Sequence, residues 1–77
     1  MSHYEQRLQL EKTKIEANNE ISLEELAKLC GISKQTVIKD LETRIAEVYP
    51  ELEIVARAIL YRHKADVFVE DQDLVSK

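Results

Sequence analysis

The 77-residue sequence contains one glycine, one proline, one cysteine and no tryptophan. So little glycine and proline leaves almost no material for tight β-hairpins or for the glycine-rich loops that hold phosphate groups. The single cysteine, Cys30, excludes an internal disulfide, and with only two distant histidines, His3 and His63, it cannot complete a zinc site. Three tyrosines and one phenylalanine leave the core to aliphatic residues. These absences favour an all-α domain.

Long hydrophobic runs are absent as well. No apolar stretch approaches the roughly 18 residues of a membrane span, and Met1 to Arg7 lack the apolar segment of a signal peptide. We therefore expect a cytoplasmic protein with no membrane partner. The sequence also lacks a P-loop, a nucleophile beside a base and a pair of metal ligands, so we expect no enzyme, no cofactor and no metal site. A chain this short forms one small domain.

Acidic residues outnumber basic ones by 15 to 11, which gives a formal net charge of −4. An acidic total argues against a protein that binds nucleic acid through charge alone. The charges are unevenly spread, however. Residues 33–39 hold two lysines and no acid, three more bases lie within residues 57–64, and acids concentrate at residues 20–25 and 70–73. The total therefore does not exclude DNA binding by residues 33–39.

The first helix is predicted to begin at Ser2, because Ser2 and Glu5 have the spacing of a capping box. It should end near Asn18 and Asn19, since asparagine tolerates the left-handed conformation that terminates helices.

The second helix has a stronger start signal. Ser22 and Glu25 form another capping box, and Ile21 and Leu26 add the apolar pair of a hydrophobic staple. The only glycine follows where a helix end favours one. The pattern predicts a short helix over about residues 23–30.

A third helix is predicted over residues 33–48, because Ser33 is an N-cap residue and apolar residues recur every three or four positions. Pro50 disfavours helical geometry at the residue before it and suits the start of a fourth helix. Apolar residues from Leu52 to Leu60 then follow helical spacing. The alternative, a β-hairpin wing over this stretch, lacks turn residues and alternation.

The end of the chain has an apolar part followed by an acidic part. Residues 67–69 (Val-Phe-Val) predict either a short strand or an apolar strap packed on the helices, and residues 70–77 read as a frayed acidic tail. The expected architecture is a compact four-helix domain over residues 1–66, followed by an acidic C-terminal tail over residues 67–77.

The second and third helices fit a helix-turn-helix. Such a motif needs a small residue one turn before the glycine, the glycine itself, and apolar residues that fill the wedge between the helices. Ala27, Gly31, Ile32 and Val37 occupy these positions. A purely architectural corner, or a domain that binds proteins, is the alternative interpretation.

The start of the third helix supplies the candidate DNA-binding residues, which are Ser33, Lys34, Gln35, Thr36, Ile38 and Lys39. Gln35 can pair with adenine in the major groove, and Lys34 can reach guanine or a phosphate. Ser33, Thr36 and Lys39 suit phosphate contacts, and Ile38 suits a thymine methyl group. Each has a structural alternative: an N-cap for Ser33, a helix-start residue for Thr36, solvated charges for the lysines, and packing under the fourth helix for Ile38. Arg57, Arg62 and Lys64 are expected to extend this surface as a basic strip.

The sequence resembles the stage III sporulation protein D family, which are small bacterial transcription regulators of endospore-forming bacteria. The resemblance spans roughly residues 4–64 and rests on Ser33-Lys34-Gln35-Thr36-Val37-Ile38-Lys39-Asp40-Leu41, Thr43-Arg44, Pro50-Glu51-Leu52 and Ile59-Leu60-Tyr61-Arg62-His63-Lys64. It implies a helix-turn-helix protein that acts directly at promoters, with Ser33, Lys34, Thr36 and Lys39 at the DNA. The family adds DNA contacts through a basic segment after the fourth helix, whereas this chain is apolar and then acidic there.

The sequence thus predicts a sequence-specific DNA-binding transcription regulator whose helix 33–48 enters the major groove. Its expected partners are double-stranded DNA at promoter sites and, as a second candidate, RNA polymerase, with the chain acting as a monomer or a homodimer. The alternative is an acidic helical protein-interaction module, such as an antirepressor, that does not itself bind DNA.

Overall fold

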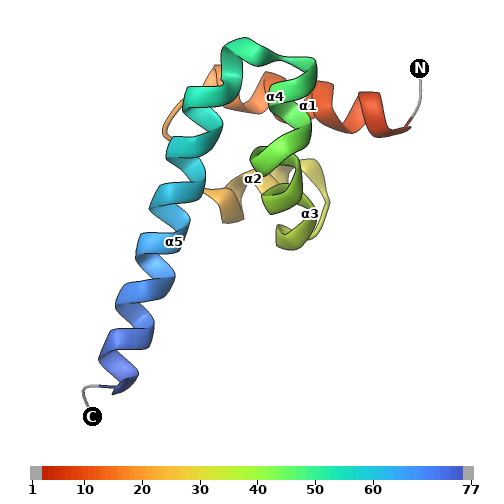
Figure 1. Ribbon diagram of the computed structural model, residues 1–77. Helices are drawn as coiled ribbons and strands as arrows, with labels where there is room; N and C mark the ends of the chain where they lie inside the picture. Colours follow the sequence, from red (N-terminus) through yellow and green to blue (C-terminus); the bar gives the residue numbers. More distant parts are fainter. Residues whose placement is uncertain (1–2, 76–77) are drawn as a thin grey trace.

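The computed structural model describes the backbone of residues 3–75 and the side chains of residues 3–66. Its elements are α1 (His3–Ala17), α2 (Leu23–Cys30), α3 (Lys34–Lys39), a π-helical segment (Asp40–Arg44), α4 (Ile45–Val48), a 3-10 turn (Pro50–Leu52) and α5 (Glu53–Val75) (Figure 1). The described part of the chain contains no strand, so the all-α prediction is confirmed. The predicted cap at Ser2 lies outside the described residues.

The second helix has the predicted ends. The Ser22 hydroxyl accepts a hydrogen bond from the Glu25 backbone N–H at 3.1 Å, which caps the start of α2. At the other end Gly31 adopts a left-handed conformation, with φ of 67°. The backbone N–H groups of Gly31 and Ile32 donate to the carbonyls of Lys28 and Ala27, which closes the last turn in a Schellman motif.

The third predicted helix is one continuous helical run, from Lys34 to Val48, but a π-helical turn interrupts it at Asp40–Arg44. Val37, Leu41 and Ile45 are spaced by four residues, more than the roughly 3.6 residues of an α-helical turn. The wider π turn keeps Leu41 and Ile45 on the same buried side as Val37. The regular spacing of the apolar residues did not predict this interruption.

The stretch after Pro50 is helical, as predicted, and the β-hairpin wing is wrong. The helix opens as a 3-10 turn with Pro50 at its start and continues as the 23-residue α5. The strand considered for residues 67–69 is also wrong, because these residues lie within α5. Whether their side chains form an apolar strap lies outside the described side chains. The boundary drawn between residues 66 and 67 therefore falls inside a helix whose backbone continues to Val75.

The core is aliphatic, as expected, and draws on every helix, including the short α4, which contributes Ile45. Its members are Leu8, Ile15, Ile21, Leu23, Leu26, Ala27, Val37, Leu41, Ile45, Leu52, Ala56, Ile59 and Leu60. Figure 1 shows α1 to α4 gathered around the first half of α5, while the second half of α5 extends away from them. The molecule is accordingly elongated, measuring 50 × 23 × 21 Å.

Candidate nucleic-acid interface

The corner between α2 and α3 has the register predicted for a helix-turn-helix. Ala27 and Val37 are buried, and Ile32 is half-buried against the core, so the wedge between the two helices is filled as expected. A Cβ atom at Gly31 would meet no other atom within 4 Å. The glycine is therefore required by its positive φ and not by lack of space. The corner fixes the direction in which α3 leaves the core.

The first residues of α3 divide into exposed and engaged side chains. Ser33, Lys34, Gln35 and Lys39 are exposed. The Ser33 Oγ accepts a hydrogen bond from the Thr36 backbone N–H at 3.2 Å and lies 2.9 Å from the Thr36 Oγ1. Ser33 is therefore the N-cap of α3, and the half-buried Thr36 hydroxyl is already paired with it.

Ile38 is half-buried and packs against the core. This placement favours the packing alternative over a contact with a thymine methyl group. The exposed candidate DNA-binding residues at the start of α3 are therefore Ser33, Lys34, Gln35 and Lys39.

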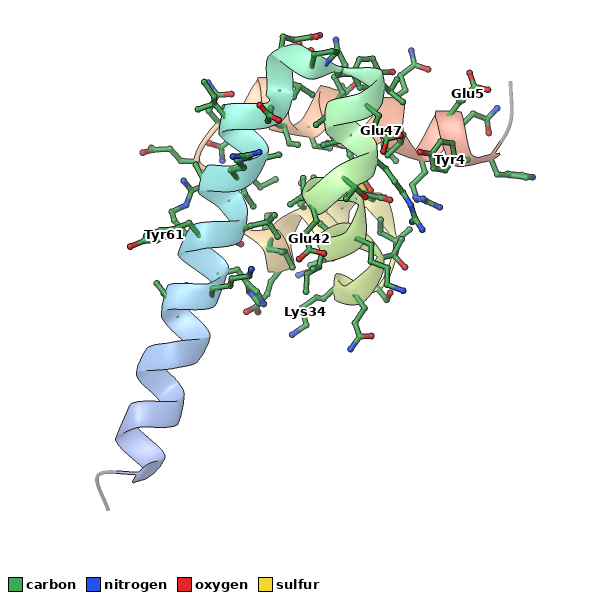
Figure 2. The ribbon with its side chains drawn as sticks, viewed as in Figure 1. Tyr4, Glu5, Lys34, Glu42, Glu47 and Tyr61 are labelled. Atoms are coloured by element: carbon green, nitrogen blue, oxygen red, sulfur yellow. The ribbon has the colours of Figure 1, made fainter. Side chains whose placement is uncertain are left out.

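Neither Lys34 nor Lys39 forms an ion pair within the described part of the chain. Figure 2 shows Lys34 projecting from the start of α3, with Glu42 further along the same helical run on the same side. Residues 33–39 thus present two unpaired positive charges, and the exposed Glu42 marks the acidic limit of this surface.

Two cations of α5, Arg57 and Arg62, have partners of their own. Arg57 pairs with Glu53 one turn earlier at 3.4 Å, and both side chains are exposed. Arg62 donates a hydrogen bond of 3.2 Å to the backbone carbonyl of Ile21, which ties α5 to the start of α2. Lys64 is exposed. No hydrogen bond or ion pair among the described residues joins these side chains to α3, so the predicted continuous basic strip gains no support from contacts.

A buried polar cluster fastens α1 to the third helical run. The Asp40 carboxylate, fully buried, accepts hydrogen bonds from Arg7 Nε at 2.8 Å, Arg7 Nη2 at 3.0 Å and Arg44 Nη1 at 3.1 Å. Burial acts to raise the pKa of Asp40, but the neighbouring Glu11 and the hydrogen bonds from Arg7 and Arg44 outweigh it and hold that pKa below its ordinary value. Asp40 is therefore ionised, and it orients the helical run that carries Lys34 and Lys39.

Glu11 adjoins this cluster and is also fully buried. Neither of its carboxyl oxygens has a hydrogen-bond partner among the described residues. Burial, with the neighbouring Asp40 adding to it, raises the pKa of Glu11 to about 9. Glu11 is thus protonated at neutral pH, so it places no second negative charge beside the ionised Asp40. The folded protein carries one negative charge fewer than its formal −4.

Sequence patterns did not predict this cluster. Asp40 and Arg44 have the four-residue spacing of a helical ion pair, which was the only local signal available. Arg7 lies 33 residues from Asp40 in the sequence, so no spacing rule connects the two.

The remaining described features include one cysteine and one groove. Cys30 is half-buried, and burial raises the pKa of its thiol, which disfavours the reactive thiolate. Among residues 3–66 no group of three metal-ligating side chains is found. A groove of about 380 Å³ lies between the start of α2 and α5, where Arg62, His63 and Asp66 line it. Within the described residues, no helix combines the length and apolar character needed to cross a membrane.

The chain matches no protein-family model, no curated protein and no solved structure. The resemblance drawn from residues 33–64 therefore stays a prediction.

Proposed function

We propose that this protein is a sequence-specific DNA-binding transcription regulator that inserts the helical run Lys34–Val48 into the major groove. The observation that carries the proposal is the α2–Gly31–α3 corner, which leaves Ser33, Lys34, Gln35 and Lys39 exposed at one end of the run. A helix-turn-helix protein reads bases with the N-terminal residues of its second helix. Glutamine and lysine are among the side chains that hydrogen-bond to base edges in the major groove.

Each exposed side chain has a role in this proposal. Gln35 pairs with the N6/N7 edge of an adenine, and Lys34 donates to guanine O6/N7 or to a phosphate. Lys39, one turn further along, contacts the phosphate backbone. Ser33 and Thr36 already satisfy each other, so their contribution is to hold the start of α3 in place.

The buried Arg7–Asp40–Arg44 cluster supports the same reading. It removes the acid nearest to Lys39 from the surface and neutralises it with two arginines. The surface of residues 33–39 is therefore positively charged and has no exposed acid directly after it, although the net charge of the chain is −4. We expect weak non-specific binding, because few lysines are available to displace counterions from DNA.

The test is selection of binding sites from a random duplex library at low ionic strength, followed by fluorescence polarisation on the selected and scrambled duplexes. The proposal expects a preferred sequence and an affinity that falls as salt is raised. Lys28→Ala is the matched control, because Lys28 is exposed on α2 outside the proposed surface. Absence of binding to any duplex at low salt would overturn the proposal.

The resemblance to the sporulation regulators adds promoters as the sites and RNA polymerase as a second partner. The competing function is a protein-interaction module, which the exposed acids Glu24 and Glu25 at the start of α2 favour. Co-purification of a stable basic protein by a chain with no DNA affinity would support that function instead.

A further inference from the structure

The outer face of α5 exposes two large apolar side chains. Ile54 is 81% exposed and Tyr61 is 75% exposed, which makes them the most exposed large hydrophobic residues among those described. Figure 2 shows Tyr61 pointing away from the other helices. Single exposed hydrophobic residues are ordinary, but these two lie seven residues apart and therefore share one face of the helix.

The core uses the opposite face of α5. Ala56, Ile59 and Leu60 are buried against the other helices. Ala58 and Ala65 are exposed and lie with Ile54 and Tyr61, so the outer face reads 54, 58, 61, 65. Steps of four, three and four residues are the spacing with which two helices pack along an apolar seam. In the sequence the same steps continue to Phe68, Gln72 and Val75.

Beyond Leu60, the described side-chain hydrogen bond between α5 and the rest of the chain is the one from Arg62 to the Ile21 carbonyl. Residues 61–66 contribute no side chain to the core, and all but the half-buried His63 are exposed. Figure 1 shows this part of the helix extending away from the other elements. A helix of about 12–15 residues is only marginally stable in water without packing. A partner along the outer face would supply that packing.

Charge identifies the partner. The first half of α5 carries three bases, Arg57, Arg62 and Lys64, against one acid, Glu53, while the sequence from residue 66 to residue 73 carries four acids and no base. A shallow depression of about 220 Å³, lined by Arg57, Leu60, Tyr61 and Lys64, places two of these cations beside the seam. A second α5 running in the opposite direction sets the basic half of each helix against the acidic half of the other.

We propose that two copies of this chain associate through the outer face of α5 in an antiparallel pair, with Ile54, Ala58, Tyr61 and Ala65 in the seam. A parallel pair would set like charges side by side, which is destabilising. The two-fold axis passes near Ala65, midway between the basic and the acidic half. This association does not depend on DNA.

Sedimentation equilibrium of the full chain over a range of concentrations tests the association. The expected result is a reversible dimer whose dissociation constant rises by about tenfold or more in Tyr61→Glu. Leu29→Glu is the matched control, because Leu29 is 48% exposed on α2 and lies off the seam. Lys64→Glu keeps the apolar seam intact and should also weaken the dimer, which separates the effect from any loss of folding. A monomer at all concentrations, or a dimer insensitive to both variants, would overturn the proposal.

Cross-linking tests the orientation. In a Cys30→Ser background, Ala65→Cys should form an intermolecular disulfide readily, because the two residues 65 meet at the axis. Ala58→Cys should not, because residues 58 of an antiparallel pair lie about 20 Å apart along the helices. Equally efficient cross-linking of both variants would overturn the antiparallel arrangement.

Discussion

The guanidinium of Arg7 donates two hydrogen bonds to the carboxylate of Asp40, at 2.8 and 3.0 Å, and so joins α1 to the start of the π-helical turn. Such a two-pronged pair fixes orientation as well as distance. Arg44 adds a third hydrogen bond from the next turn of the same helical run. The pair therefore sets how α1 and the proposed recognition helix lie against each other.

Replacing Asp40 should destabilise the protein strongly. In Asp40→Ala two arginines lose a buried partner, and breaking such a pair costs about 3–5 kcal/mol. Because the Arg7 and Arg44 side chains are 25% and 39% exposed and can regain water, we expect the lower end of that range. Urea denaturation followed by circular dichroism measures the change. Glu42→Ala, two positions away and exposed, is the control and should change stability by less than about 0.5 kcal/mol.

The buried Glu11 should make stability fall as pH rises. Its folded pKa of about 9 lies above the value of an unfolded glutamate, so the folded state holds a proton that the unfolded state has released. The stabilisation is complete below about pH 4.3 and is lost as pH rises toward the folded pKa. Between pH 5 and 8 we expect a loss approaching about 1 kcal/mol per pH unit.

Glu11→Gln isolates this effect, because the neutral amide is close in size to the protonated carboxyl and does not titrate. The variant should match the original chain near pH 5 and exceed its stability at pH 8. Urea denaturation at each pH is the measurement. Parallel stability profiles for the two chains would show that Glu11 is ionised in the folded state.

Gly31→Ala should cost about 1 kcal/mol of stability, because a side chain penalises the positive φ at this position. The space around the Cβ position is open, so no clash adds to this cost. Gly31→Asn should cost less, since asparagine tolerates the left-handed conformation better. Thermal denaturation of the three chains gives the ranking. Equal losses in both variants would indicate that something other than backbone conformation is disturbed.

Local signals made the corner between α2 and α3 predictable. The caps at Ser22 and Ser33 and the turn at Gly31 are each decided within a few residues, and all three are confirmed. The Arg7–Asp40 pair was not predictable, because it depends on how distant segments pack. The strand at residues 67–69 failed because a short apolar run fits either a strand or a helix, and here the preceding helix continues through it. For Ile38 the sequence left both a DNA contact and core packing open, and its half-buried place against the core favours packing.

Two substitutions on α3 should separate charge from base reading in the proposed DNA complex. Lys39→Ala should weaken binding to all duplexes by a similar factor, because it removes one phosphate contact. The slope of the logarithm of the binding constant against the logarithm of salt concentration should become shallower by about one unit. Gln35→Ala should instead relax the preference at one base pair, at a cost of about 1–3 kcal/mol on the preferred duplex only. Polarisation titrations of each variant on the preferred duplex and on its single-base variants, at several salt concentrations, make the comparison. A uniform loss in both variants would show that Gln35 does not read a base, while the DNA-binding surface itself would still include both residues.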